Sequence, residues 1–419
     1  MIRVSNISGD IFGGLTAAVV ALPLALAFGV QSGMGAIAGL YGAIALGIFA
    51  ALFGGTNTQI SGPTGPMAVV ASAIVAGEVA LYGSLDAALG TIVATFVLAA
   101  AFQIGMGLSR IGQYIRYMPY PVISGFMSGI GLIIIFMQIF PFLGLTSPRT
   151  IVDIFIGLPA VVERINYQAV GLTLVTITII YLFPKVTKKV PATLVALILL
   201  SLLSAFMGLD VSVIGNIPQG LPDVHVYTLL SMDWHHPMVI IIPALTLAAL
   251  GAIDSLLTSV VADNMTKTQH DSNKELIGQG IGNMIAGLVG GLLGAGATMR
   301  TVVNINAGGT GNLSGIVHGL ALLVVLLGAG AYAKLIPLPV LAGILITVGI
   351  GIIDYKGIKH LFRVPRADAI VMIIVLFLTV FVDLLQAVAI GLVLAALLFM
   401  KQMGEVAESK ALSASLNGL

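Results

Sequence analysis

The sequence predicts an all-α polytopic membrane protein with fourteen transmembrane segments, arranged as a seven-plus-seven inverted repeat. The first observation is composition: the chain has 419 residues, of which 58% are hydrophobic and only 8% are charged. A soluble protein of this length needs more charge on its surface. The second observation is an internal repeat, and the third is a pair of interrupted apolar segments. The net charge of +1 does not indicate a nucleic-acid partner, and the absence of Cys excludes disulfides and Cys-ligated metals.

Apolar segments long enough to cross a bilayer follow one another along the chain. Two further segments are apolar but interrupted by Gly, Pro, Ser, Thr and Asn; we call them the broken segments, and they lie near residues 56–77 and 293–309. Counting each broken segment as one crossing gives fourteen. The twelve full spans lie near residues 11–30, 35–54, 86–109, 119–142, 168–184, 190–207, 237–262, 275–292, 313–333, 337–354, 368–383 and 386–401.

The basic residues orient these spans. With the N-terminus inside, the predicted outside segments hold only Arg149, Arg164 and Lys334, and every other Lys or Arg except Arg300 falls in a predicted cytoplasmic segment. This is a positive-inside pattern. We therefore expect both termini in the cytoplasm and the protein in the plasma (inner) membrane.

The repeat is visible as two pairs of matching stretches. RYMPYPVISGFMSGIGLII (116–134) and KLIPLPVLAGILITVGIGII (334–353) share basic-x-x-Pro-x-Pro-Val-x-x-Gly. GAIALGIFAALFGG (42–55) matches GQGIGNMIAGLVGG (278–291), and a broken segment follows each. Seven spans per copy is an odd number, so the copies have opposite orientation. Inverted repeats with paired broken helices are typical of secondary transporters that bind substrate between the breaks.

Each broken segment predicts a short extended piece followed by a helix start. FGGTNTQISGPTGPMAVVASAI (53–74) starts its helix at the proline-rich turn, and GLLGAGATMRTVVNINAGG (291–309) starts near Thr298. Two helix N-termini that meet inside the membrane favour a small anion. Arg300 lies in the second segment, where an unpaired Arg costs about 2.5–3.5 kcal/mol or more. A bound anion would supply its counter-charge; the alternative is a permanent ion pair that holds helices together.

Asp254 is the acidic residue that lies well inside a span, in PALTLAALGAIDSLLTSVVAD (243–263), and Thr258 shares its helix face. With backbone carbonyls of residues 296–298, the pair could bind Na⁺; alternatively, Asp254 carries a coupling proton or pairs with Arg300. If Asp254 and Arg300 face one pocket, one monovalent anion and one Na⁺ keep the loaded site neutral. The remaining acidic candidates fall at span ends, where we expect them to be interfacial: Glu78, Asp354, Asp368 and Asp383.

Other chemistry has little support. His318 lies inside a span, where a packing role is favoured over a proton relay, and the remaining His residues show no metal-ligand spacing. GQGIGNMIAG indicates close helix packing. The sequence has no phosphate-binding loop motif, and spacing alone assembles no Ser–His–Asp set, so we expect no enzyme and no organic cofactor.

The sequence resembles the SulP family of anion transporters over nearly the whole chain, and four stretches carry the resemblance. They are GDIFGGLTAAVVALPLALAFGV (9–30), ISGPTGPMAVV (60–70), MPYPVISGFMSGIG (118–131) and AIDSLLTSVVADNMTKTQHDSNKELIGQGIGN (252–283). With GAGATM (294–299), the last stretch is similar to the bacterial sodium-dependent bicarbonate transporters of that family. Arg300 matches an Arg common in the wider family.

The resemblance implies a mobile core of segments 1–4 and 8–11 and a gate of segments 5–7 and 12–14, working as an elevator, in a homodimer. The corresponding ranges are 1–109 and 208–334 for the core, and 110–207 and 335–405 for the gate. It also implies that residues 406–419 form a cytoplasmic tail where family members usually continue into a STAS domain. Carried over by position, the sodium site is Asp254, Thr258, Gly296, Ala297 and Thr298. The anion site is Thr64, Gly65, Ala297 and Thr298, with Arg300 beside them.

We therefore expect Na⁺-coupled bicarbonate uptake. Within transport, the alternatives are an H⁺-coupled sulfate or dicarboxylate carrier and an anion exchanger. An uncoupled anion channel forms a second class, and a structural scaffold is disfavoured because it gives no reason to keep two costly charges in the bilayer. Nucleobase carriers of related fold usually place Glu where this chain has Arg300.

Overall fold

The computed structural model describes most of the chain. The described residues are 6–115, 119–148, 151–161, 164–187, 190–214, 224–225, 237–333, 335–360, 366–382, 387, 390–391 and 393–394. The last predicted span, near 386–401, lies largely outside them. Asp383 and the predicted tail lie wholly outside them. So do nine of the basic residues used for orientation, namely Arg3, Arg116, Arg149, Lys188, Lys189, Lys334, Arg363, Lys401 and Lys410.

Helices make up nearly all of the regular structure. In chain order the elements are α1 (Ile7–Gln31), α2 (Ala36–Phe53), β1 (Ser61–Gly62), α3 (Gly65–Tyr82), α4 (Leu85–Leu108), α5 (Gly112–Ile115), α6 (Tyr120–Met137), α7 (Ile139–Phe142), α8 (Ile151–Val161), α9 (Tyr167–Val186), α10 (Ala192–Met207), α12 (Pro237–Thr266), α13 (Ser272–Leu288), β2 (Ala295–Gly296), α14 (Thr298–Asn306), α15 (Leu313–Ala333), α16 (Leu338–Ile352), α17 (Tyr355–His360) and α18 (Arg366–Phe381).

The predicted spans coincide with these helices wherever the structure describes them. Within the described residues, seven helices are long and apolar enough to cross a membrane, and four shorter helices are also apolar. The protein is therefore a mostly helical membrane protein. The count of fourteen segments stays a prediction, as does the inverted repeat.

Capping residues explain several of the helix starts. The side chain of Asn6 accepts a hydrogen bond from the backbone N–H of Gly9 at the start of α1, and Asp271 accepts from Asn273 and Lys274 at the start of α13. Such caps satisfy N–H groups that have no partner within the helix.

The first broken segment differs from its prediction in one respect. We expected a short helix ending near residue 77, but α3 has 18 residues and runs through Gly77 to Tyr82. Its end is set by Gly83, which has a φ of 83° in the left-handed region that glycine adopts readily. Only the helix of the second broken segment is short, because α14 has 9 residues.

The extended pieces predicted before both helices are present, and they pair with each other. β1 and β2 are antiparallel, with Ser61 opposite Gly296 and Gly62 opposite Ala295. The backbone N–H of Ala297 extends the ladder by donating to the carbonyl of Ile60 at 2.8 Å. Since α3 follows β1 and α14 follows β2, both helices begin at this ladder and leave it from opposite ends.

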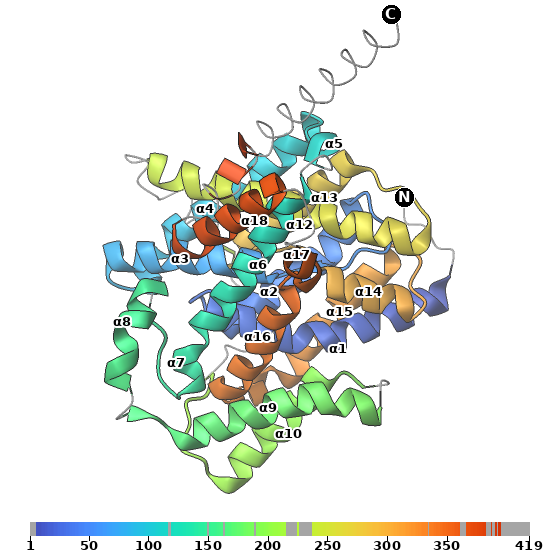
Figure 1. The fold of residues 1–419 in the computed structure, drawn as a ribbon. Helices are drawn as coiled ribbons and strands as arrows, with labels where there is room; N and C mark the ends of the chain where they lie inside the picture. Colours follow the sequence, from blue (N-terminus) through green and yellow to red (C-terminus); the bar gives the residue numbers. More distant parts are fainter. Residues whose placement is uncertain are drawn as a thin grey trace, which may run out of the picture. The chain divides into compact units, whose positions relative to one another are not determined.

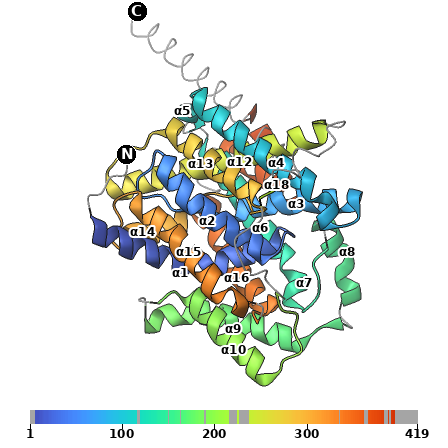
Figure 2. The ribbon, with the colours of Figure 1, turned by 180° about the vertical axis from the view of Figure 1, so that it is seen from behind.

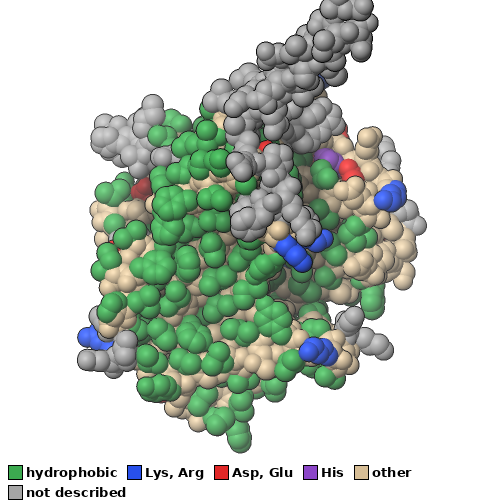
Figure 3. Space-filling model, viewed as in Figure 1, with side chains coloured by type: hydrophobic (Ala, Val, Ile, Leu, Met, Phe, Trp, Pro, Cys, Tyr) green, Lys and Arg blue, Asp and Glu red, His purple; other side chains and the backbone are tan. Residues whose placement is uncertain are grey.

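The chain packs as two compact units. Unit 1 comprises Met1–Arg116 and Ile134–Gly349, and unit 2 comprises Tyr117–Ile133 and Ile350–Leu419. Within unit 1, α13 packs against α4 and α2, while α1, α14 and α15 lie side by side (Figures 1 and 2). The face drawn in Figure 3 carries mainly hydrophobic side chains, as expected of a surface in contact with lipid. The predicted division into core and gate stays a prediction.

Asp354 organises the described part of unit 2. It lies beyond the end of α16, where its Oδ2 accepts hydrogen bonds from the hydroxyls of Tyr120 and, at 2.6 Å, of Ser124. Its Oδ1 accepts from the backbone N–H of Gly357 at 3.0 Å. Partial burial raises the pKa of the Asp354 carboxyl, but these hydrogen bonds outweigh burial and bring the pKa below its ordinary value of 3.8.

Candidate functional site

Thr258 contacts two other predicted sodium ligands where α12 passes the strand pair. The hydroxyl of Thr258 donates to the carbonyl oxygen of Gly296 at 2.9 Å and lies 2.7 Å from the hydroxyl oxygen of Thr298. Because Thr258 has one hydroxyl proton, Thr298 donates in the second contact. Thr258 is fully buried. Three oxygen atoms from α12, β2 and α14 thus meet at one point.

Asp254 lies one helical turn before Thr258 and is also buried, with 8% of its surface exposed. Its Oδ2 accepts a hydrogen bond of 2.8 Å from the hydroxyl of Thr64. Thr64 is the N-cap residue of α3, and its own backbone is extended. The structure therefore connects Asp254, a predicted cation ligand, to Thr64, a predicted anion ligand.

Arg300 lies in the first turn of α14 and is 2% exposed. Its Nη2 donates to the carbonyl of Pro63 at 2.6 Å, so the guanidinium reaches across the strand pair to the start of α3. Its Nη1 is buried and has no hydrogen-bond partner among the described residues. A Cβ at Gly62 would lie 2.7 Å from this Nη1, so a side chain at position 62 would displace the guanidinium from its present place.

The two buried charges share one region without a direct bond. Arg300 and Asp254 are both described and interact electrostatically, but no ion pair within 4.0 Å joins them. The alternative of a permanent direct ion pair is therefore not what the structure shows. The Nη1 atom of Arg300 keeps its capacity to donate to an acceptor that enters the site.

Sequence reasoning missed Glu275, a carboxylate in the first turn of α13 with 1% of its surface exposed. Its Oε2 accepts from the backbone N–H groups of Gly55 at 2.9 Å and Thr56 at 2.8 Å. Its Oε1 accepts from the side-chain amides of Gln59 at 2.7 Å and Gln279 at 2.8 Å. Four donors thus satisfy this carboxylate, and they fix the backbone that leads into β1.

Two more polar residues follow Glu275 on the same face of α13, because positions four apart lie above one another. The amide of Gln279 donates to the hydroxyl of Ser61 in β1 at 2.6 Å. Asn283 accepts from the backbone N–H of Gly294 at 2.9 Å and donates to the carbonyl of the same residue at 3.0 Å. We call Glu275, Gln279 and Asn283 the α13 column.

Neighbouring helices complete this support. The hydroxyl of Ser255 on α12 accepts from the backbone N–H of Gly296 at 3.1 Å, and the hydroxyl of Thr301 on α14 accepts from that of Ile60 at 3.0 Å. Backbone outside helices persists at membrane depth only where other groups satisfy it. The α13 column and these hydroxyls supply such partners.

The sequence contained a signal for the column. GQGIGNMIAG was interpreted as close packing, and α13 does pack closely against α2 and α4. The same stretch also places Gln279 and Asn283 inside an apolar span, four residues apart. Buried polar residues at that spacing in a membrane helix indicate a functional or structural partner.

Two other buried polar residues have a described environment. Asp10, also missed, accepts through Oδ1 from the backbone N–H groups of Thr310 at 2.7 Å and Gly311 at 2.8 Å, which fixes the turn after α14. His318 is fully buried beside Gly47, and within the described part of the chain neither ring nitrogen has a hydrogen-bond partner. Its predicted packing role stays a prediction.

The structure assembles a Ser–His–Asp set that spacing did not predict. The hydroxyl of Ser272 lies 2.9 Å from Nε2 of His270, whose Nδ1 lies 2.6 Å from Oδ2 of Asp263. A hydrolytic serine also needs free N–H donors for the oxyanion. Here Asp271 accepts from the backbone N–H groups of Asn273 and Lys274 at the same helix start. The set is better explained as a clamp between α12 and α13.

The oxygen atoms around Thr258 could serve as ligands for a hard monovalent cation. They are carboxylate, hydroxyl and carbonyl oxygens, the ligand type that hard cations prefer. Within the described residues, no group of three or more His, Cys, Asp or Glu side chains could hold a metal ion.

Comparisons with known proteins agree with this architecture. A model of the sulfate permease family matches residues 7–375. The bicarbonate transporter BicA of Picosynechococcus sp. is 47% identical over 415 residues, which cover 98% of this chain and 73% of that protein. BicA of Synechocystis sp. is 49% identical over 414 residues, covering 98% and 72%. The putative sulfate transporter YvdB of Bacillus subtilis is 36% identical over 405 residues, covering 94% and 74%.

Solved structures show the same fold. The transmembrane domain of a cyanobacterium bicarbonate transporter BicA matches with a TM-score of 0.85 and 47% identity, over 92% of this chain and 98% of that chain. SLC26A9 matches with a TM-score of 0.83 over 94% of this chain and 65% of that chain. At 21% identity, that likeness concerns the fold alone.

Proposed function

The chain belongs to the sulfate permease family of anion transporters, and we propose that it carries bicarbonate into the cell together with Na⁺. One observation carries the proposal. Oxygen donors from α12, β2 and α14 converge beside the starts of α3 and α14, where a buried guanidinium keeps one N–H group unused. The relatives named as bicarbonate transporters support the choice of anion.

In this proposal Na⁺ binds where Thr258, Thr298 and the carbonyl of Gly296 meet, with Asp254 supplying the negative charge. The Ala297 carbonyl next along the chain completes the proposed set. The hydroxyl of Thr64 then reorients toward the anion when the cation occupies the Asp254 carboxylate. This exchange gives a physical route by which one ion influences the binding of the other.

The anion binds between the first turns of α3 and α14. Their N–H groups carry partial positive charge, and Thr64, Gly65, Ala297 and Thr298 line the two starts. Arg300 adds one full positive charge. Because Asp254 and Arg300 cancel, the site stays neutral when it holds one Na⁺ and one bicarbonate, which lowers the cost of moving it through the bilayer.

The proposed architecture has fourteen segments in two inverted copies, with both termini in the cytoplasm. The core carries the site past the gate as an elevator, and the protein works as a homodimer in the plasma (inner) membrane. The antiparallel pairing of β1 with β2 supports the repeat, since two copies of opposite orientation would bring their extended pieces together in this way.

Uptake into proteoliposomes tests the proposal. Labelled bicarbonate should accumulate when Na⁺ is higher outside, and the rate should fall when choline replaces Na⁺. Empty liposomes control for CO₂ diffusion. Equal initial rates with and without a sodium gradient would reject the coupling, and absence of bicarbonate uptake at any gradient would reject the substrate.

A second candidate is an H⁺-coupled sulfate or dicarboxylate carrier, or an anion exchanger. The 36% identical relative named as a putative sulfate transporter favours it, as does the extra positive charge of Arg300, which suits a divalent anion. H⁺ coupling predicts sulfate uptake that rises with acid outside and ignores Na⁺. Exchange predicts uptake only when the liposomes are preloaded with an anion.

A further inference from the structure

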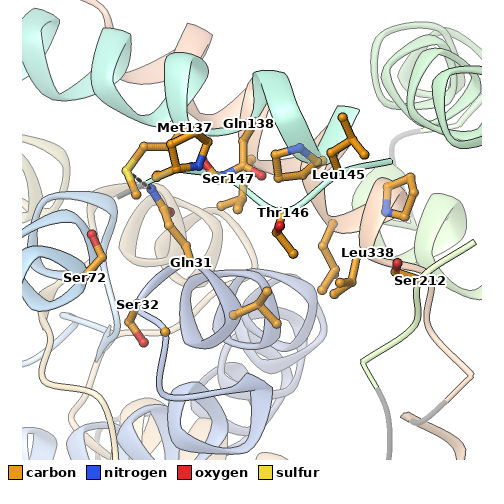
Figure 4. A pocket seen from close by; sticks show the side chains of 18 of the residues that line it. Gln31, Ser32, Ser72, Met137, Gln138, Leu145, Thr146, Ser147, Ser212 and Leu338 are labelled. Atoms are coloured by element: carbon orange, nitrogen blue, oxygen red, sulfur yellow. Dashed lines mark hydrogen bonds between the residues drawn. The ribbon is translucent and has the colours of Figure 1, made fainter. Parts of the chain in front are cut away.

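Unit 1 contains a cavity of about 390 Å³ that is separate from the ion site. Its walls are the end of α1, the middle and later turns of α3, the α7 region with the loop after it, and the first turns of α16 (Figure 4). Thr64, Asp254 and Arg300 are not among its lining residues. Pockets that bind small molecules commonly have volumes of about 300–1,000 Å³, so this one has room for a ligand.

The described lining is uncharged. It contains no Asp, Glu, Lys, Arg or His residue, and it includes the buried apolar side chains of Val75 and Leu341. Such a wall offers an anion no counter-charge, and removing an anion from water to enter it is costly. The cavity therefore does not have the chemistry of the transported ion.

One polar group in this wall lacks suitable partners. The amide nitrogen of Gln31, which ends α1, donates only to the thioether sulfur of Met137, at 3.9 Å, and sulfur is a weak acceptor. The amide oxygen of Gln31 is buried and accepts no hydrogen bond from any residue that the structure describes. Figure 4 shows Gln31 among the lining side chains, close to Met137 and Gln138. A half-buried amide whose nitrogen has only a weak acceptor, and whose oxygen has no donor among the described residues, matches a ligand that offers a donor and an acceptor side by side.

We propose that this cavity is a second binding site, for a neutral amphipathic molecule with a carboxamide-like group. That group pairs with the amide of Gln31, and the apolar remainder packs against Val75 and Leu341. Because α3 starts at the ion site and its later turns line the cavity, a bound molecule links α3 to α16. Occupancy is expected to slow transport if α3 moves past α16 during the cycle.

The absence of cysteine allows a direct test. Ser72→Cys places a single thiol in the cavity wall, and Ala87→Cys places one at an exposed position near the start of α4. Each variant is treated with a neutral benzyl methanethiosulfonate and with its anionic sulfonatoethyl counterpart. The proposal predicts a preference for the neutral reagent at Ser72→Cys that is clearly greater than at Ala87→Cys. Equal preferences would overturn it, because they would place the wall on an anion-accessible path.

Benzamide serves as the probe ligand. Saturating benzamide should slow modification of Ser72→Cys and leave Ala87→Cys unchanged. Adding Gln31→Leu should weaken that protection by about tenfold or more, since two hydrogen bonds to the ligand are lost. The labelling rate without benzamide reports whether the double variant keeps the cavity. No protection by benzamide, or protection that Gln31→Leu leaves intact, would overturn the proposal.

Two further comparisons identify the natural ligand and its effect. Slower labelling in liposomes than in lipid-free micelles, without benzamide, would show that a membrane amphiphile occupies the cavity; equal rates would exclude a membrane amphiphile as the occupant. Benzyl-modified Ser72→Cys should transport more slowly than benzyl-modified Ala87→Cys. The labelling results do not depend on which anion is carried. They can therefore support the second binding site even if the uptake assay rejects bicarbonate as the substrate.

Discussion

Glu275→Gln is the substitution whose cost the structure defines best. Each carboxylate oxygen of Glu275 accepts two N–H donors. A glutamine in the same place must turn its NH₂ group toward one of these pairs, whichever way the amide is oriented. Two N–H donors then face another donor. The backbone N–H groups of Gly55 and Thr56 cannot turn away, and the amides of Gln59 and Gln279 can do so only by rotating out of their present hydrogen bonds with Ser259 and Ser61. At about 1–3 kcal/mol for each unsatisfied group, the expected loss of unfolding free energy is about 2–6 kcal/mol.

The measurement is unfolding in mixed micelles with increasing sodium dodecyl sulfate, followed by circular dichroism. Asp86→Asn is the matched control, because it neutralises an exposed carboxylate in the first turn of α4. That change should cost about 0.3–1 kcal/mol through the helix dipole. If Glu275→Gln unfolds together with the control, Glu275 does not hold the approach to β1 and the hydrogen-bond accounting is wrong.

Three further substitutions probe separate parts of the molecule. Asp254→Asn should abolish the stimulation of uptake by Na⁺ while expression stays near normal, since the amide keeps the shape but not the charge; an unchanged sodium response would move the cation site elsewhere. Gly62→Ala pushes a methyl group against the guanidinium of Arg300 and should raise the half-saturating anion concentration about tenfold. Gly77→Ala, where the added methyl group meets no atom within 4 Å, should leave that concentration unchanged, and a similar rise in both variants would contradict the reasoning. Asp354→Asn removes a carboxylate whose pKa is lowered in the folded state, so the parent's stability advantage should be full above pH 3.8 and disappear as the pH falls through the lowered folded pKa. An advantage of constant size down to the lowest pH would show that the charge of Asp354 contributes nothing.

The spans that the structure describes and the extended pieces were predictable from the sequence, whereas the contact of Thr258 with the second broken segment was expected from the family resemblance. Hydropathy and helix-start signals are local, and they report directly on which residues enter the membrane. The short helix α8 was not predictable in this way, because its 11 residues are too few to cross a bilayer. The length of α3 was misjudged because Gly77 resembles a stop, whereas its neighbours continue the helix.

The α13 column was harder to predict because its partners are distant in the sequence. Glu275 bonds to residues about 220 positions away, and its role follows only once β1 and α13 are adjacent. Gln279 and Asn283 were visible as polar residues in an apolar span, but spacing alone does not reveal what they face. The periodicity of the helix tells which residues share a face. Only the tertiary arrangement tells which residues of other elements lie against that face.

Hydrogen-bond capacity distinguishes the two buried carboxylates near the strand pair. Glu275 accepts four N–H donors, so its lone pairs are engaged and little capacity is left for an ion. In the described part of the chain, the donor to Asp254 is a single hydroxyl, that of Thr64, which can rotate away. A carboxylate that must bind and release a cation needs lone pairs that are free or easily freed. By this criterion Asp254 is the residue suited to exchange an ion, and Glu275 is suited to hold the backbone beside it in place.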